Sequence, residues 1–212
     1  VVLFVAALAV ESFLWSDRPD KAWYDGRAVA ESVKTLAWKF AVGAPPFPID
    51  LDDTIAINSF IKKLDSIQSQ FSELDLEAID SKVVSDWMVR QRSTPWENRR
   101  SSYLQNRLQN QKDWYAKKAK YNKKRSKQWR FALVSLEVLG AIAALLEALT
   151  QIGILIGPTI AAVVGAVVAW VETKQHDSLA RAYSAAVADL AKAESKLSLV
   201  HNEATWASEV ND

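Results

Sequence analysis

The sequence predicts an all-α protein that contains a membrane helical hairpin. Residues 131–171 hold two apolar runs of 19 and 20 residues, separated only by Thr150 and Gln151. A helix needs roughly 20 residues to cross a bilayer core about 30 Å thick, so each run is long enough for one crossing. Outside the hairpin, apolar residues recur at spacings of three and four, which is typical of long helices that pack in antiparallel or coiled-coil pairs.

A soluble fold is the alternative explanation for the two apolar runs. Two apolar helices can also form the buried core of a large globular protein. That arrangement requires other apolar segments to cover them, and the remaining sequence has few of these. We therefore expect residues 131–171 to enter a membrane and return.

Small residues recur at every fourth position along the second apolar run. Such a face lets the backbone of a neighbouring helix approach closely in lipid. We expect this stripe to pack the membrane part of a homo-oligomer or to line its pore; its members are Gly153, Gly157, Ala161 and Gly165.

Two acidic residues interrupt the first apolar run. Glu137 lies six residues inside the run, about 9 Å from its start at helical rise. A carboxylate inside a bilayer is costly unless it is paired or faces water, so Glu137 is a candidate pore position. The alternative is that it reaches the headgroup region or pairs with a basic neighbour. Glu147 lies one turn before the polar break and is expected to be hydrated.

The net charge is only +1, but the charges are segregated along the chain. Residues 48–86 contain nine acids and three lysines, whereas residues 90–130 contain fourteen basic and two acidic side chains. Because basic segments beside membrane helices stay in the cytoplasm, we expect both long helical regions to face the cytoplasm. The basic block is expected to contact membrane lipid, and no nucleic-acid polymer is expected as a partner.

Residues 1–48 are predicted to form the end of a first helical unit. The chain begins VVLFVAALAV without Met, so residues 1–14 are expected to be the end of a membrane helix whose start is missing. A helix follows from Pro19 with an apolar seam that requires a partner helix. The GAPPFP sequence at 43–48 ends it, because consecutive prolines cannot continue a helix.

Residues 49–95 are predicted to be an acidic connector with helices near 52–71 and 75–92. A second unit at 96–212 is expected to comprise one long helix, the hairpin, and a coiled-coil helix at 172–205. The partner of that last helix is either the long helix before the hairpin or a helix of another subunit.

An internal repeat supports two related units. RAVAESVKTLA at 27–37 and RAYSAAVADLA at 181–191 share Arg, Ala, Val, Leu and Ala at matching places, and each follows an apolar run that ends in Val-Glu. The chain is therefore predicted to contain a duplicated unit of helix, hairpin and helix.

The sequence lacks the patterns of common catalytic and metal sites. It has no Cys, no Gly-rich phosphate loop and no Gly-x-Ser-x-Gly motif, and its two histidines, His176 and His201, are not spaced as metal ligands. We expect a protein that is not an enzyme and holds no metal or cofactor. His176 lies near Glu172 and Asp177 and is expected to form a hydrated ion pair.

Two segments resemble the SLATT family of two-transmembrane effector domains. They are WYDGRAVAESVKTLAWKFAVGAPPF at 23–47 and YLQNRLQNQKDWYAKKAKYNKKRSKQWRF at 103–131. The first resembles the tail of one SLATT subtype, and the second, extended to about 200, resembles another, so a tandem pair is expected with the first copy truncated.

The resemblance implies a membrane effector of a bacterial antiphage conflict system. Such a protein would form a pore or disrupt the inner membrane under control of a cyclic nucleotide signal. A secreted α-helical pore-forming toxin and a non-conducting membrane scaffold or sensor are the alternatives.

A cyclic nucleotide ligand would require cationic and aromatic side chains in the cytoplasmic helices, because it presents phosphates and flat bases. Residues 23–38 supply such a set at helical spacings, and two arginines open the neighbouring long helix. Packing of the two tryptophans on the bundle core or on headgroups is the alternative. The candidate ligand residues are Trp23, Arg27, Lys34, Trp38, Arg99 and Arg100.

Overall fold

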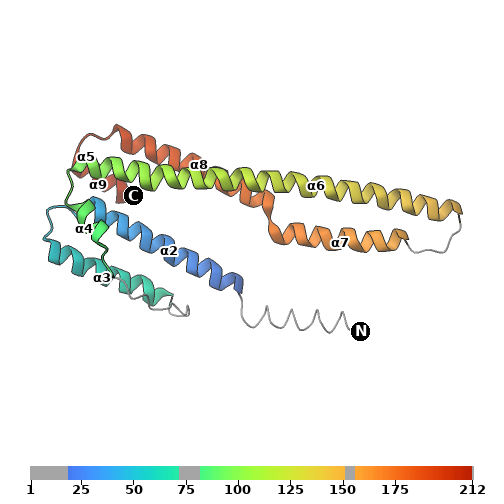
Figure 1. Ribbon diagram of the computed structural model, residues 1–212, viewed down its shortest axis with the longest axis horizontal. Helices are drawn as coiled ribbons and strands as arrows, with labels where there is room; N and C mark the ends of the chain where they lie inside the picture. Colours follow the sequence, from blue (N-terminus) through green and yellow to red (C-terminus); the bar gives the residue numbers. More distant parts are fainter. Residues whose placement is uncertain (1–18, 72–81, 151–155, 212) are drawn as a thin grey trace. The chain divides into compact units, whose positions relative to one another are not determined.

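The computed structural model describes residues 19–71, 82–150 and 156–211, and every regular element within those ranges is a helix (Figure 1). The all-α prediction is confirmed for this part of the chain. The chain divides into two compact units, Val1–Arg107 with Leu197–Asp212 and Leu108–Lys196. The helices are α2 (Pro19–Val42), α3 (Asp53–Gln70), α4 (Asp86–Arg92), α5 (Trp96–Ser102), α6 (Asn110–Thr150), α7 (Ile156–Lys174), α8 (His176–Leu199) and α9 (Glu203–Asn211), with a π-helical segment at Tyr103–Gln109.

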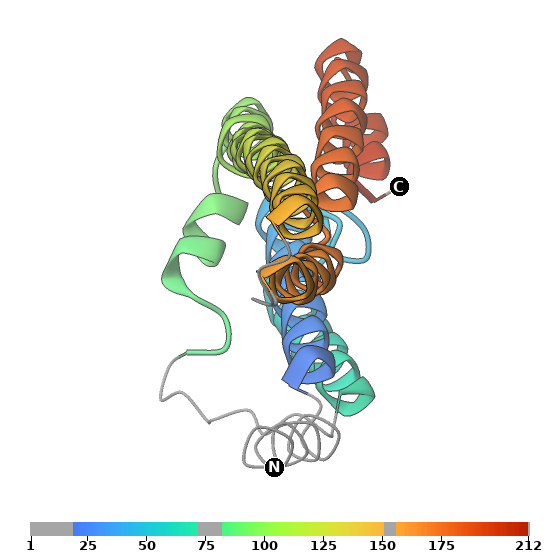
Figure 2. The same ribbon diagram turned by 90° about the vertical axis from the view of Figure 1, so that its right-hand side faces the viewer.

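Helix α2 is the centre of the first unit. It contacts α3, α4, α5 and α9, and α2 and α3 lie side by side in both ribbon views (Figures 1 and 2). Phe40 of α2 packs against Phe47 and Phe60, with ring centroids 5.5 to 5.9 Å apart. All three rings are buried, and each buried aromatic side chain stabilises the fold by about 1.5–3 kcal/mol.

The predicted end of α2 at the GAPPFP segment is confirmed. Gly43 has φ 75°, and the Ala44 amide donates to the Lys39 carbonyl at 2.9 Å. This is the hydrogen bond of a Schellman C-cap, which favours glycine because its backbone adopts the left-handed conformation without strain. A β-carbon at position 43 would also lie 2.7 Å from the Arg99 Nη1 atom.

Of the two helices predicted in the acidic stretch, one is confirmed and the other begins later than predicted. The prediction at 52–71 is confirmed by α3, and Asp52 caps α3 by accepting the Thr54 amide at 2.9 Å. The prediction at 75–92 is wrong over 82–85, because α4 begins only at Asp86. Ser85 has an extended backbone and accepts the Met88 amide, which starts the helix there. Residues 72–81 lie outside the described ranges.

The second unit is formed by α6, α7 and α8. Helix α6 runs for 41 residues from the basic block into the apolar run without a break, as predicted. Helices α6 and α7 contact each other and lie side by side in both views (Figures 1 and 2). The π-helical segment between α5 and α6 was not predicted; it inserts an additional residue per turn into an otherwise continuous helix.

The expected pairing of α8 with the long helix is confirmed within this unit. Tyr183 of α8 packs against Trp114 and Tyr115 of α6, with ring centroids 5.8 Å apart in both pairs. Lys112 of α6 and Glu194 of α8 form an ion pair. Large aromatic side chains, rather than a close backbone approach, therefore join these two helices.

The prediction of one continuous helix at 172–205 is wrong at two places. Gln175 has φ 49°, a left-handed conformation that separates α7 from α8. The second break follows Leu199, and Asn202 caps α9 by accepting the Thr205 amide at 3.1 Å. The apolar seam continues through the second break, which is why periodicity alone did not reveal it. Around the first break, residues 172–178 contain no apolar side chain, so periodicity gave no information there.

Candidate functional site

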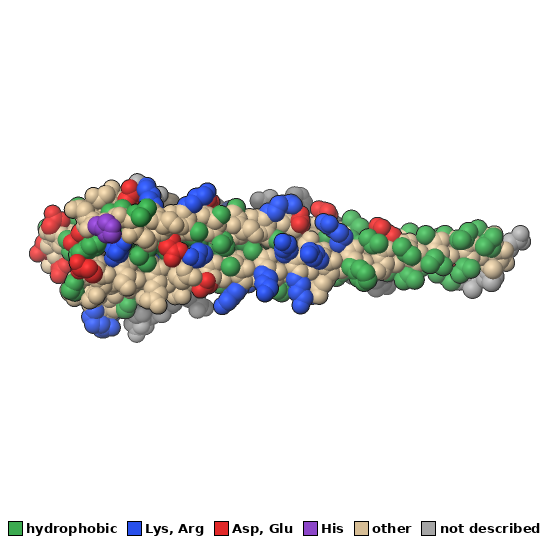
Figure 3. Space-filling model, turned by 90° about the horizontal axis from the view of Figure 1, so that it is seen from above, with side chains coloured by type: hydrophobic (Ala, Val, Ile, Leu, Met, Phe, Trp, Pro, Cys, Tyr) green, Lys and Arg blue, Asp and Glu red, His purple; other side chains and the backbone are tan. Residues whose placement is uncertain are grey.

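The apolar surface of α6 and α7 is the most prominent functional feature of the described residues. Both helices are long and apolar enough to cross a membrane, and no residue in the most apolar window of either is buried. Phe131 is 76% exposed and Leu149 is 71% exposed. Figure 3 shows hydrophobic side chains covering this part of the molecule. Within the described residues no segment covers the pair, and an exposed apolar surface of this extent is typical of a membrane or protein interface.

A band of cationic side chains adjoins the apolar surface, as Figure 3 shows. On α7, the Lys174 ammonium lies 4.4 Å from the centroid of the Trp170 ring. On α6, Trp129 and Arg130 immediately precede the apolar run. Tryptophan with lysine or arginine is typical of the boundary between hydrocarbon and headgroups.

Glycines allow close contact between α6 and α7. A β-carbon at Gly140 would lie 3.1 Å from Ile160 Cγ2, and one at Gly157 would lie 3.1 Å from Glu147 Oε2. By contrast, a β-carbon at Gly165 would meet nothing within 4 Å. The stripe of small residues predicted from the sequence is thus divided. Gly157 lies in the contact between α6 and α7, and Gly165 faces open space. Gly153 lies outside the described residues.

Glu147 caps the start of α7. Its Oε1 atom accepts the Ile156 amide at 2.5 Å and the Gly157 amide at 3.1 Å. The first amides of a helix have no partner within the helix, and the helix dipole favours a negative charge there. The half-buried Glu147 carboxylate therefore connects α6 with the start of α7.

A groove of about 490 Å³ lies between α6 and α7. Its walls are apolar except for Glu137 and Glu147, and Ala161 also lines it. Glu137 is exposed and lies two helical turns after Arg130, near the start of the apolar segment of α6. The groove thus holds two carboxylates on an otherwise apolar surface, where a charge is costly unless it is paired or faces water.

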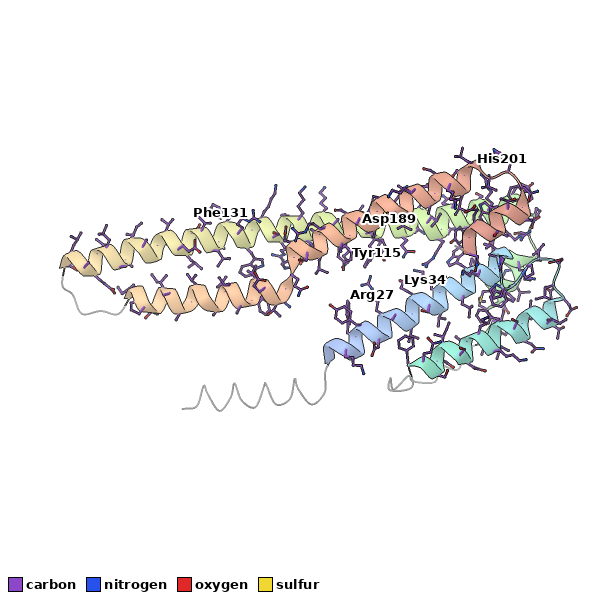
Figure 4. All side chains as sticks on the ribbon, turned by 180° about the vertical axis from the view of Figure 1, so that it is seen from behind. Arg27, Lys34, Tyr115, Phe131, Asp189 and His201 are labelled. Carbon is purple, nitrogen blue, oxygen red and sulfur yellow. The ribbon has the colours of Figure 1, made fainter. Side chains whose placement is uncertain are left out.

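Three candidate ligand residues lie on the exposed face of α2. The Arg27 guanidinium lies 5.6 Å from the centroid of the Trp23 ring, a cation–π geometry. Trp23 is 56% exposed and also packs edge-on against Tyr24. Lys34 is exposed two turns further along the helix, and Figure 4 shows Arg27 and Lys34 on α2. The structure thus brings Trp23 and Arg27 together.

The other three candidate residues lie in packed positions. Trp38 is buried between Trp87 and Tyr103, with ring centroids 4.9 and 5.7 Å away. Arg99 is 5% exposed, donates to the Val42 carbonyl at 2.7 Å and pairs with Glu203.

Arg100 donates to the Ser198 carbonyl at 2.6 Å, near the end of α8. The side chains of Arg99 and Arg100 therefore bind backbone carbonyls at the ends of α2 and α8. The six residues do not share one exposed face, and the ligand site remains a prediction.

Sequence reasoning missed two other buried arginines. Arg92 donates to the carbonyls of Phe47 and Pro48, each at 2.8 Å, and so holds the GAPPFP loop. Arg107, in the π-helical segment, donates to Thr35 Oγ1 at 3.0 Å and pairs with Glu31. Arg92 ends α4 before the break at Ser93–Pro95, and Arg107 lies in the π-helical segment, so no periodicity within one α-helix marked these two residues.

His176 was expected to form a hydrated ion pair, but its hydrogen bond is to Asn122. Its Nδ1 atom lies 2.7 Å from Asn122 Oδ1, and Asn122 is buried and donates to the Lys118 carbonyl. Burial lowers the pKa of His176, and the positive charges of Arg125 and Lys174 lower it further. Among the described residues, no group of three or more His, Asp or Glu has the arrangement of a metal site.

Together, the exposed apolar hairpin and its cationic boundary define a membrane-associated helical protein. Comparison with protein families is consistent with this class. Residues 103–212 match the SMODS and SLOG-associating 2TM effector domain 1 (SLATT_1), and residues 1–100 match the SMODS and SLOG-associating 2TM effector domain 3 (SLATT_3). The chain belongs to the SLATT family, and the predicted tandem pair is confirmed. No curated protein and no solved structure matches the sequence.

Proposed function

We propose that this membrane effector forms a pore or disrupts the bacterial inner membrane, under control of a cyclic nucleotide signal. The observation that carries the proposal is the groove between α6 and α7, in which Glu137 and Glu147 line an otherwise apolar wall. Glu147 also caps α7, so Glu137 is the carboxylate that a simple anchor would not require, since a charge at that depth is costly in lipid.

Assembly of several hairpins would supply the remaining wall of a pore. Gly165 leaves room for the backbone of another helix, since a β-carbon there would touch nothing in the described chain. The apolar side chains that remain exposed around it would face lipid or neighbouring hairpins. A ring of Glu137 carboxylates in such an oligomer would favour the passage of cations.

Conductance across a planar bilayer tests the pore. We expect the parent chain to conduct with a preference for cations, and Glu137→Gln to lose most of that preference while inserting equally well. Asp189→Asn, an exposed acid of α8 in a surface pair with Lys192, is the matched control and should conduct like the parent. Membrane insertion without conductance or dye leakage would favour the non-conducting scaffold instead.

Calorimetry with cyclic di- and trinucleotides tests whether a nucleotide ligand binds and regulates the protein. Trp23→Ala with Arg27→Ala should abolish binding, because the exposed Trp23 offers the aromatic face and the half-buried Arg27 offers the guanidinium. Lys62→Ala removes an exposed positive charge from α3 and is the control. A double variant that binds a nucleotide as tightly as the parent would exclude this site. Membrane leakage that no nucleotide changes would exclude regulation by a cyclic nucleotide.

A further inference from the structure

A second cavity, of about 360 Å³, lies at the junction of α7 and α8. Three helices of one unit line it: α6 contributes Ser126 and Trp129, α7 contributes Glu172, and α8 contributes Ser178 and Arg181. The left-handed conformation of Gln175 turns the chain between α7 and α8 and so brings these groups around one space. Unlike the groove in the apolar segment, this cavity has a mainly polar lining.

The cavity lies where the two apolar runs end. Trp129 is two residues before Phe131, the first residue of the first run, and Glu172 directly follows Val171, the last residue of the second. Since α6 and α7 are neighbours, both walls end at the same level along the hairpin. That level corresponds to the headgroups of a bilayer that surrounds the apolar segments.

The charges around the cavity favour a ligand that carries a cation. Asp177 and Arg181 form an ion pair, which is neutral as a whole. His176 donates to Asn122, and its lowered pKa keeps its ring neutral at pH 7. Glu172 supplies the net negative charge of the lining, whereas Arg125 and Lys174 act on His176 from outside the lining and add positive charge nearby. A headgroup that carries both an ammonium and a phosphate matches these charges better than a headgroup with a phosphate alone.

The same cavity also offers donors to a phosphate. Helix α8 begins at His176 and is 24 residues long, so its first amides have no acceptor within the helix and its dipole is positive at this end. Ser178 in that first turn and Ser126 opposite add hydroxyl groups. A phosphate at this helix end and an ammonium at Glu172 would both be satisfied.

We propose that this cavity binds the headgroup of phosphatidylethanolamine, with its ammonium on Glu172 and its phosphate at the start of α8. The acyl chains would follow the apolar surface of α6 and α7. A primary ammonium donates three hydrogen bonds to acceptors such as a carboxylate. A phosphatidylcholine headgroup donates none, and a phosphatidylglycerol headgroup supplies no cation. The proposal rests on insertion of the hairpin into a membrane but not on pore formation.

Native mass spectrometry of the full chain in detergent tests the site, with equal amounts of the three lipids added. We expect phosphatidylethanolamine to be retained about tenfold more than the other two, as a charge-assisted hydrogen bond allows. Glu172→Gln should reduce its retention to the level of phosphatidylcholine, and Asp189→Asn should leave it unchanged. Preference for phosphatidylglycerol, or equal retention by Glu172→Gln, would overturn the proposal.

Soluble competitors separate the headgroup from a simple phosphate site. Phosphoethanolamine should displace the lipid at concentrations at which inorganic phosphate does not. Displacement by both at the same concentration would show a general anion site and overturn the proposal. Circular dichroism of Glu172→Gln verifies its fold; because Glu172 is exposed and Gln is isosteric, the melting temperature should not change. These measurements do not depend on conductance, so they can support headgroup binding even if the protein forms no pore.

Discussion

The sequence suggests Arg99 as a ligand residue, but in the structure its side chain binds other parts of the first unit. Its guanidinium binds the Val42 and Thr94 carbonyls and pairs with Glu203, thereby connecting α2, α5 and α9. We expect Arg99→Ala to lower the free energy of unfolding of the first unit by about 2–3 kcal/mol, because the Val42 and Thr94 carbonyls lose their donor; Glu203 is partly exposed, so loss of the ion pair itself adds little. Chemical denaturation measures this, with Arg90→Ala on the exposed face of α4 as a control; equal stability of the two variants would contradict it.

Gly43 is constrained both by its backbone and by its neighbour. Gly43→Ala places a side chain at φ 75° and brings its β-carbon against Arg99 Nη1. We expect a loss of about 1–2 kcal/mol from the left-handed conformation alone, and a further loss if Arg99 must move. Gly26→Ala is the control, since a β-carbon at position 26 meets nothing within 4 Å; it should be as stable as the parent or more stable.

His176 is expected to make the second unit less stable in mild acid. Its pKa is lowered in the folded state, so the unfolded chain takes up a proton first as the pH falls below about 6.5. Stability is therefore unaffected above that pH and is lost as the pH falls toward the lowered folded pKa. Thermal melts from pH 7.5 to 5 measure the effect, and His176→Gln should flatten this dependence, whereas His201→Gln, at an exposed position, should not (Figure 4).

At the scale of elements, the division of the glycine stripe leads to opposite expectations for two positions. Gly165→Leu should leave the hairpin intact but lower the oligomer size and abolish leakage, because position 165 faces open space. Gly140→Leu should instead disturb the α6–α7 contact, since its side chain would collide with Ile160. Crosslinking in membranes and protease protection distinguish these effects; an unchanged oligomer in Gly165→Leu would show that α7 does not form the subunit contact.

Helices with clear starts and stops were predictable, and those defined by tertiary contacts were not. The spacing of apolar residues located α3 within one residue at each end, and GAPPFP located the end of α2. The break at Gln175 has no such signal, because glutamine rarely adopts a positive φ and no glycine or proline lies near it in the sequence.

The candidate site was predictable to a similar extent. Glu137 and Gly157 were found from their place in an apolar run, since lipid limits which residues occur there. The capping bond of Glu147 and the burial of Arg99 depend on the distance between segments far apart in the sequence, which periodicity does not contain.

At the scale of the whole molecule, orientation across the membrane is the property to measure first. The cationic band beside the apolar segment and the uncharged stretch between the two runs favour a cytoplasmic position for both ends of the hairpin. A reporter fused at Gln151 should signal outside and one fused at Asp212 inside. Signals on the same side would contradict the hairpin topology, whatever the outcome of the conductance assays.

Helix α6 has a mechanical consequence beyond its role as a membrane span. Its 41 residues form one α-helix, which at 1.5 Å per residue is about 60 Å long. A rod of hydrogen-bonded turns resists torsion, so a rotation imposed at Asn110 would be transmitted to Glu137 with little loss. The π-helical segment lies directly before Asn110. Conversion of this segment to α-helix would remove its additional residue per turn and would rotate α6 about its own axis.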